Sequence, residues 1–466
     1  MRRRNSSVSF RVVQAVGLAT LTTFLVAVYL RQERLSALHL LSVRRHDPAP
    51  DGKPQHQPAA ADKRAPSAAA ADGAVAATVK VVAQAAAKPL PEPWGSHHMF
   101  ASPGAYGTCP KEWIEGSWTS PRSMGSATLP LTLEAQREIY EHQHPKDCSK
   151  AKYLIYRVVP NGIGAVFHVA GVGLHLALDL GRVFIEAPGT FLTNTKECGD
   201  RKTLDSCYFM PFAGCQPTAE QLRNAVQLFG HTPLDSHADA AVLIASHDSL
   251  LKVRPHAPRR FQERLQTTAL QPKKHYYWWR AQSVAYMLRL RPEVRADLEA
   301  RRKKTLAGPA PAPGCISVHV RHGDKGVEAE TFDNPVYDRT ASKVRALDPS
   351  RFTNQLFVST EDPDTIEYFV NHTSSKWRTG FTRGVPRKPD RSRPNLSYMA
   401  EIGYYEEMLN SLLNLDLALE CSAFVGSIYS NWVRLIDELR ATLRCKADAV
   451  FADVRYENPH EMDLNW

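Results

Sequence analysis

A dense group of charged side chains follows one apolar, β-branched stretch of the sequence. Residues 316–330 read ISVHVRHGDKGVEAE, and polar side chains crowd the middle of this stretch: His319, Arg321, His322, Asp324 and Lys325. A guanidinium can bind a phosphate through two parallel hydrogen bonds, and an ammonium adds a point charge. We therefore expect a strand over 315–320 that ends at a phosphate-binding site.

Two more apolar stretches also end in polar residues. Glu361 and Asp362 follow LFVST, whereas Ser430 and Asn431 follow AFVGS and open an expected helix. Carboxylates accept hydrogen bonds from a base or a ribose, and a helix N-terminus binds phosphate oxygens. Each residue alone is better explained as a surface ion pair or a helix cap. Together, the three strand ends predict a nucleoside diphosphate site.

The residues Asp362, Pro363 and Asp364 form a D-x-D pattern, which can hold a divalent metal through its two carboxylates. Pro363, however, suits the first position of a helix, and acidic residues are favoured in a first helical turn. We interpret Asp364 as a partner of the helix dipole, and we expect no metal at the site.

A glycine-rich loop, Asn161-Gly162-Ile163-Gly164, lies between an expected strand and an expected helix. Backbone N–H groups face outward at a helix N-terminus, so Gly162 and Gly164 could let an anion approach. The glycines could equally well serve only to make a tight turn. The loop alone does not decide between these two interpretations.

Strands alternate with helices from residue 153 to residue 443. Strand, loop, helix and strand are expected over 153–186, and Gly181 is expected to end the helix. A helix pair or a kinked helix is expected over 278–305, with Pro292 as the kink or the new start. The strand at 315–320 is followed by a helix at 335–346, a strand at 356–360, helices at 363–370 and 403–420, a strand at 423–427 and a helix at 430–443.

This alternation predicts parallel sheets with crossover helices. We expect an α/β fold of two facing Rossmann-type domains, an N-terminal half over 101–305 and a nucleotide-sugar-binding half over 306–466. Ligands of parallel sheets bind at the carboxyl ends of the strands. The polar strand ends should therefore meet in the cleft between the two domains.

The first 100 residues predict a membrane anchor and a spacer. Arginines precede an uncharged run over 12–30, which is about the length that spans a bilayer, and positive charge favours a cytoplasmic N-terminus. We expect a cytoplasmic tail over 1–11, a single transmembrane helix over 12–30 and an Ala/Pro-rich disordered stem over 31–100. A cleaved signal peptide and an organelle transit peptide are the alternatives. The order of segments is typical of type II Golgi membrane enzymes with a lumenal body.

The charge distribution argues against a nucleic-acid partner. The net charge is +10, but residues 1–66 hold eleven Lys or Arg against four Asp or Glu, so the remaining chain is nearly neutral. A nucleic-acid-binding domain would need its basic face on the folded part.

All eight cysteines follow residue 100, and an even number in a lumenal body permits disulfides. The group Cys198, Cys207 and Cys215 is the region where bonds are most expected. Cys315 and Cys421 lie in apolar runs, and we expect them to be buried free thiols. A zinc site is the alternative for the group, although the chain has no C-x-x-C pair. The sequons at Asn371 and Asn395 agree with a lumenal location.

Several motifs, in order over about 150–445, resemble the α-1,6-fucosyltransferase family, which includes core and nodulation fucosyltransferases. The specific block is WWRAQSVAYMLRLRPEVRADLEARRKK followed by ISVHVRHGDKGVEAE. VPNGIGAVFHVA, LFVSTEDPD and LLNLDLALECSAFVGSIYSNWVR are similar to further family motifs. The resemblance implies a GT-B-like fold and a metal-independent, inverting transfer of fucose from GDP-fucose to a glycan or glycoprotein.

The resemblance also implies roles for individual residues. Arg321 would bind the diphosphate, Lys325 would support the leaving phosphate, and the donor GDP would be held by His319, Asp324, Glu361 and Asp362. Inverting transfer needs a base on the acceptor side, and cations on the diphosphate can replace a metal. Glu328 is the preferred base, and Glu330 is the second candidate.

Three positions depart from the family pattern. His322 stands where the family has a second arginine, and we expect it to bind the donor as a weaker phosphate ligand, because histidine is only partly charged near neutral pH. Ala329 occupies the place of the family's glutamate, between Glu328 and Glu330. Asn414 occupies the place of an acid in the third motif, with Asp416 nearby. Use of another nucleotide sugar and a catalytically inactive, nucleotide- or glycan-binding role are therefore the alternatives.

Overall fold

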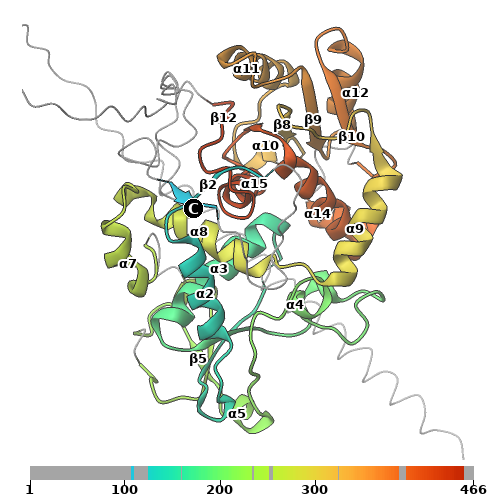
Figure 1. Ribbon diagram of the computed structural model, residues 1–466. Coiled ribbons are helices and arrows are strands. Elements are labelled where there is room, and N and C mark those ends of the chain that lie inside the picture. The colour runs from blue at the N-terminus through green and yellow to red at the C-terminus, as the bar shows by residue number, and fades with distance from the viewer. Residues whose placement is uncertain are drawn as a thin grey trace, which may run out of the picture. The chain divides into compact units, whose positions relative to one another are not determined.

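The computed structural model (Figure 1) describes residues 106–109, 124–158, 160–233, 236–250, 256–323, 325–387 and 395–455. The predicted tail, anchor and stem lie outside these residues and remain predictions. Within the described residues, no helix combines the length and the apolar character needed to cross a membrane.

The N-terminal half contains a four-stranded parallel sheet with the strand order β4-β3-β6-β5. Its strands are β3 (Tyr153–Tyr156), β4 (Val183–Glu186), β5 (Val226–Leu228) and β6 (Val242–Ala245). Helix α3 (Ile163–Asp179) crosses from β3 to β4, as predicted for residues 153–186. It ends before Gly181, whose φ of +64° favours glycine.

The C-terminal half contains a six-stranded sheet with the order β12-β11-β8-β9-β10-β7. Its strands are β7 (Leu306–Ala307), β8 (Ile316–Val320), β9 (Gln355–Thr360), β10 (Arg378–Thr382), β11 (Ala423–Gly426) and β12 (Phe451–Asp453). All pairs are parallel except the one between β7 and β10. The α/β prediction of two parallel sheets on either side of about residue 305 is therefore confirmed.

The long helices lie close to their predicted positions. Pro292 starts a new helix, so the WW segment forms two helices and not one kinked helix. The helices of eight or more residues, besides α3, are α2 (Thr132–Gln143), α7 (Arg259–Gln266), α8 (His275–Met287), α9 (Pro292–Thr305), α11 (Asn334–Leu347), α13 (Asn395–Ile402), α14 (Tyr404–Glu420) and α15 (Asn431–Ala441).

Shorter elements complete the described part. The short helices are α4 (Leu204–Cys207), α5 (Ala219–Arg223), α6 (His247–Leu250), α10 (Lys325–Glu328) and α12 (Pro363–Glu367), which continues as a π-helical turn at Tyr368–His372. Three 3-10 turns lie at Cys148–Lys150, Phe191–Thr193 and Pro272–Lys274, and strands β1 (Gly107–Thr108) and β2 (Ala127–Thr128) form a separate antiparallel pair.

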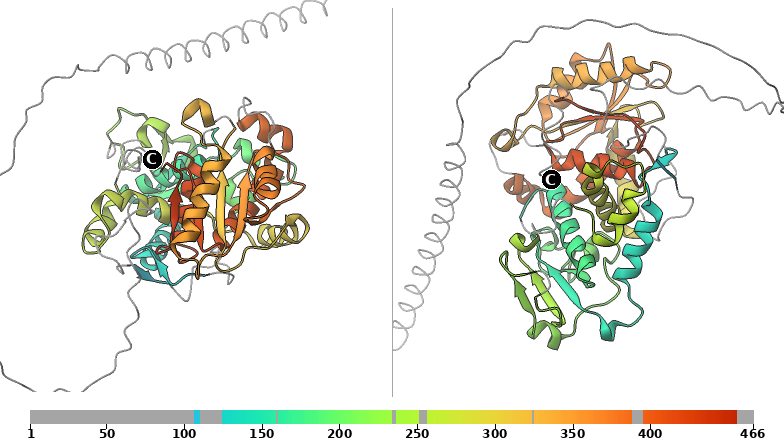
Figure 2. Two further views of the ribbon diagram at one scale, coloured as in Figure 1. Left: turned by 90° about the horizontal axis from the view of Figure 1, so that it is seen from above. Right: turned by 90° about the vertical axis from the view of Figure 1, so that its left-hand side faces the viewer.

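Helices α3, α8 and α15 form the centre of the core. They lie between the two sheets (Figures 1 and 2), and their side chains share one buried apolar cluster. Trp278 and Trp279 of α8 are fully buried, and their indole N–H groups donate to the carbonyl oxygens of Pro130 and Gly171. The WW pair therefore fixes α8 against its neighbours, and α8 in turn supports α3 and α15, whose N-termini reach the candidate site.

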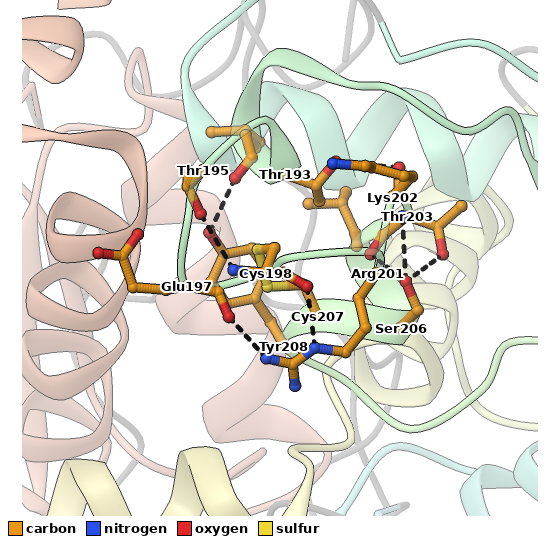
Figure 3. The surroundings of a disulfide bond; sticks show 12 residues. Thr193, Thr195, Glu197, Cys198, Arg201, Lys202, Thr203, Ser206, Cys207 and Tyr208 are labelled. Carbon is orange, nitrogen blue, oxygen red and sulfur yellow. Dashed lines mark hydrogen bonds between the residues drawn. A yellow bond between two sulfur atoms is a disulfide. The ribbon is translucent and has the colours of Figure 1, made fainter.

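All eight cysteines form disulfides: Cys109–Cys445, Cys148–Cys215, Cys198–Cys207 and Cys315–Cys421. Bonding in the group at 198–215 was predicted. Figure 3 shows the Cys198–Cys207 bond, where the Arg201 guanidinium donates to two backbone carbonyl oxygens of the same loop.

The prediction that Cys315 and Cys421 are free thiols is wrong. Cys315 directly precedes β8, Cys421 lies just before β11, and these two strands are neighbours in the sheet. The two cysteines therefore come to lie side by side, with their Cα atoms 4.8 Å apart. An apolar run predicts burial, but it does not reveal which strands are adjacent.

Candidate active site

A cavity of about 560 Å³ lies at the carboxyl ends of strands from both halves. Its volume is within the range usual for small-ligand sites. The cavity brings together eight of the predicted site residues: Gly162, Gly164, His319, Arg321, Lys325, Glu361, Ser430 and Asn431.

The ends of β8 and β9 meet in an ion pair at the cavity wall. Arg321 Nη1 donates to Glu361 Oε1 over 2.6 Å, and the same oxygen accepts the backbone N–H of His322. Gly323 has a φ of +49°, and a Cβ there would lie 2.6 Å from the Arg321 side chain. The positive φ favours glycine at this position, and a side chain there would also displace the end of the guanidinium that Glu361 orients.

His319 is a neutral ring at the cavity. Burial lowers its pKa to about 4, and Nδ1 is 2.9 Å from Ser359 Oγ. Its buried Nε2 has no hydrogen-bond partner in the described part of the chain. Because a buried polar atom is normally satisfied, Nε2 is suited to bond a ligand in the cavity.

His322 and Asp362, both predicted to bind the donor, are not among the residues that line the cavity. They form a buried pair instead, with 2.6 Å between His322 Nδ1 and Asp362 Oδ2. His322 Nε2 bonds the carbonyl oxygen of Phe332, while Asp362 also caps α12 by accepting the N–H of Asp364. Asp364 lies in the first turn of α12, as predicted. The pair therefore links the exits of β8 and β9 behind the cavity.

The predicted catalytic residues are placed only in part. Lys325 begins α10 and lines the cavity. Glu330 is exposed and is not among the lining residues. Asp324 and the side chain of Glu328 lie outside the described residues. The choice of Glu328 over Glu330 therefore stays a prediction.

The glycine loop brings two helix N-termini to the same cavity. Gly162 is the N-cap of α3, and Gly164 lies in its first turn. A Cβ on Gly164 would lie 2.9 Å from the backbone carbonyl of Asn431 and 3.0 Å from the nitrogen of Trp432. Gly164 is therefore needed for close helix approach. This approach sets the N–H groups of α3 and α15 beside each other, where both helix dipoles favour an anion.

A polar stripe on α14 was missed by the sequence analysis, apart from Asn414. Four residues spaced by one or two turns line the cavity from this otherwise leucine-rich helix: Glu407, Asn410, Ser411 and Asn414. Such spacing on a helix places side chains on one face. The pattern could have revealed the stripe, but a polar stripe on a helix usually faces solvent.

The stripe carries two groups that a ligand could use. Burial raises the pKa of Glu407 to about 7, although Ser411 donates a hydrogen bond to its carboxylate. The buried Nδ2 of Asn410 has no hydrogen-bond partner among the described residues. Asn414 instead bonds Thr382 and the backbone of Asn410, while Asp416 pairs with Arg444 away from the cavity.

Charge in the cavity comes from side chains and from helix ends. No group of three or more His, Cys, Asp or Glu that could hold a metal ion occurs among the described residues. Among the described residues, the cations that face the cavity are Arg321 and Lys325, and the acids are Glu361 and Glu407. Such a site can bind an anion, and its carboxyl groups can also accept hydrogen bonds from the hydroxyls or the nucleobase of a ligand.

No protein-family model matches the sequence, and a search of curated proteins found no similar chain. Solved structures give distant likenesses. The fucosyltransferase NodZ from Bradyrhizobium is 13% identical over 62% of this chain and 92% of its own, with a TM-score of 0.37. A mutant of Arabidopsis thaliana FUT1 in complex with GDP is 12% identical over 72% of this chain and 82% of its own, with a TM-score of 0.42. POFUT1 in complex with GDP is 10% identical over 65% of this chain and 98% of its own, with a TM-score of 0.36. Likenesses of this size do not establish a family or an activity.

Proposed function

We propose that this protein is a glycosyltransferase that transfers fucose from GDP-fucose to a glycan or glycoprotein, with inversion and without a metal. One observation carries the proposal: two helix N-termini, Arg321 and Lys325 converge on one cavity between two parallel sheets. This combination suits a nucleoside diphosphate. The choice of guanosine and fucose rests on the motif resemblance, as does the α-1,6-like character.

The proposed reaction is a single displacement at the sugar carbon C1. The base, Glu328, takes the proton of an acceptor hydroxyl, and the hydroxyl oxygen forms the new bond to C1. The bond from C1 to the β-phosphate oxygen breaks, and GDP leaves with the electron pair. Arg321, Lys325 and the two helix ends stabilise the charge that develops on the diphosphate.

Binding and donor cleavage test this function directly. The full-length protein, purified in detergent, should bind GDP by calorimetry and release GDP from GDP-fucose with a chelator present. No GDP binding would refute the proposal. Turnover with a different nucleotide sugar in a screen of GDP and UDP donors would change the donor, and GDP binding without turnover on any acceptor would favour an inactive, nucleotide-binding protein.

The assignment of the base has its own test. Glu328→Gln should keep the GDP affinity and lose turnover, because the amide cannot accept the acceptor proton at neutral pH. The matched control is Glu330→Gln, which should keep most of the turnover. The reverse result would move the base to Glu330.

We also propose that the protein is a single-pass type II membrane protein of the Golgi with a lumenal body. The anchor lies outside the described residues. The support is that all eight cysteines are bonded, since disulfides persist in oxidising compartments. Protection of the body from protease in intact vesicles, and its loss after detergent, is the expected result.

A further inference from the structure

One sequence motif, the sequon Asn371-His372-Thr373, has no part in the proposed reaction. It lies at the end of the π-helical turn Tyr368–His372, which continues α12 toward β10. An Asn-x-Ser/Thr sequence in a lumenal domain can accept an N-linked oligosaccharide, which is bulky and needs a place at the surface. The fold must therefore leave the Asn371 side chain open to solvent if this sequon is used.

The π-helical turn has an outer and an inner side. Asn371 and His372 are exposed, whereas Phe369 is fully buried and Thr373 is only 6% exposed. The Thr373 hydroxyl donates to the carbonyl oxygen of Phe369 over 2.9 Å. The Asn371 side chain forms no hydrogen bond with any described residue, and only its backbone oxygen is engaged, by the hydroxyl of Ser374. The amide nitrogen is therefore held on the outer side with no competing contact.

The turn lies at the edge of the C-terminal sheet opposite the cavity. Thr379 Oγ1, in β10, donates to the carbonyl oxygen of Phe369 over 3.0 Å, and the N–H of Trp377 donates to Thr373. These contacts place the turn at the amino end of β10, whereas the cavity lies at the carboxyl ends of the strands. Because β10 has five residues, the two edges are about 16 Å apart. An oligosaccharide on Asn371 would therefore leave the cavity open.

The other sequon has a different place in the fold. Asn395 is the first residue of α13, and Leu396, Tyr398 and Met399 of this helix line the cavity. An oligosaccharide at the start of α13 would begin beside the bound ligand. The chain thus contains one sequon far from the cavity and one next to it, which makes each a control for the other.

We propose that Asn371 is an N-glycosylation site. In the modification, Asn371 Nδ2 forms a bond to C1 of an oligosaccharide that is carried on a lipid diphosphate. The bond from C1 to the diphosphate oxygen breaks, the lipid diphosphate leaves with the electron pair, and the amide gives one proton to a base of the transferring enzyme. Since folding buries the Thr373 hydroxyl that completes the sequon, we expect the transfer to precede folding of the turn. The proposal rests on the proposed lumenal location and is independent of the proposed catalytic activity.

The test is the mass of the peptide that contains Asn371, from the full-length protein made in eukaryotic cells. The wild-type peptide should carry an oligosaccharide, and enzymatic removal in ¹⁸O water should leave a labelled aspartate at position 371. Asn371→Gln should lose this glycan, whereas the matched control Asn395→Gln should keep it. Asn371→Gln should also bind GDP as tightly as wild type, because the sequon lies at the opposite edge of the sheet.

A second pair of variants tests the sequon while leaving the asparagine in place. Thr373→Val has nearly the same shape but no hydroxyl, so it should lose the glycan on Asn371, whereas Thr373→Ser should keep it. Asn371 found unmodified in a body that is protected from protease in intact vesicles overturns the proposal alone. A body that protease digests in intact vesicles overturns the lumenal location as well. Weaker GDP binding by Asn371→Gln would contradict the placement of the glycan away from the cavity.

Discussion

The first half of the chain lines the cavity with a single glycine-rich loop at a helix N-terminus, whereas the second half supplies every charged side chain among the described lining residues. The loop 160–165 brings peptide N–H groups and the end of α3. The second half brings Arg321 and Glu361 from two strand ends and Glu407 from α14. Peptide groups are fixed by the fold and cannot titrate, whereas the side chains set the charge and the pH response.

This difference predicts two kinds of sensitivity to mutation. A change in the second half should act through charge, and so should depend on pH and on the chemical type of the new side chain. A change in the first half should act through shape, because only the path of the backbone matters there. The predictions below run from the largest expected effect to the smallest.

Arg321→Ala should weaken GDP binding about 100-fold or more, because it removes a charge-assisted contact and leaves the Glu361 carboxylate facing the ligand. Calorimetric titration with GDP measures the effect. Arg378→Ala is the control, since Arg378 is exposed at the amino end of β10 and should bind like wild type. Equal GDP affinities for the two variants would contradict the conclusion that side chains of the second half supply the charge that binds the ligand.

Gly164→Ala should destabilise the protein by about 3 kcal/mol and weaken GDP binding, because the added methyl group meets the backbone of Asn431 and Trp432. Gly181→Ala is the matched control. Its φ of +64° makes alanine unfavourable by about 1 kcal/mol, but its Cβ would meet no atom within 4 Å. Chemical denaturation and GDP titration should separate the two: only the change at Gly164 affects both readouts. A loss of GDP binding in Gly181→Ala would contradict the role given to the helix approach.

The disulfides offer a comparison of stability between the halves. Cys315–Cys421 closes a loop of 106 residues in the second half, and Cys198–Cys207 closes a loop of 9 in the first. Replacing the first pair by alanine should cost about 2 kcal/mol more than replacing the second, since a longer loop restricts the unfolded chain more. Equilibrium denaturation of the two double variants measures the difference. Equal losses would mean that the remaining disulfides already restrict both unfolded chains to the same extent.

Glu407 should make the stability depend on pH. Its pKa is about 7 in the folded protein because of burial, and it is ordinary in the unfolded chain. The protonated carboxyl therefore favours folding below about pH 4.5, and this advantage is lost as pH rises to 7. Between about pH 4.5 and pH 7, Glu407→Gln should lose about 1–2 kcal/mol less folding stability than wild type. This difference is smaller than the pKa shift alone would give, because the side chain is partly exposed.

The adjacent Glu406 provides a control of opposite sign. The hydrogen bond and charge of Arg301 lower the pKa of Glu406, so its contribution to stability is present above about pH 4.5 and is lost as pH falls through the lowered pKa. Between pH 4.5 and pH 7.5, the stability of Glu406→Gln relative to wild type should therefore fall, whereas that of Glu407→Gln should rise. Unfolding midpoints measured at the two pH values check this. Parallel shifts would show that folding does not raise the pKa of Glu407.

The strand ends were accessible from the sequence, because an apolar run followed by polar residues marks where a parallel strand leaves the core. Arg321, Glu361 and Asn431 were found in this way. His322 and Asp362 follow the same pattern but face each other, since neighbouring strand exits also need to be joined. The pattern locates an edge of the sheet, and it does not separate the side chains that face a ligand from those that hold the edge together.

Contacts across long sequence distances could not be predicted. The His168 ring of α3 lies within hydrogen-bond distance of the Asn431 side chain, 263 residues further along the chain, and nothing local in α3 distinguishes it from an ordinary core histidine. The bond between Cys315 and Cys421 depends on strand order, which periodicity does not give. Both features need the packing of α3 on α15 or of β8 on β11, so they follow from the assembled fold and not from any single segment.

The bond between Cys109 and Cys445 has a consequence for proteolysis. The two residues are 336 positions apart, so the bond closes nearly the whole described part of the chain into one covalent ring. A single cut anywhere inside this ring opens it without releasing a fragment, and the nicked protein should run as one band until a reductant is added. Release of the whole body from a tether therefore requires a cut before Cys109.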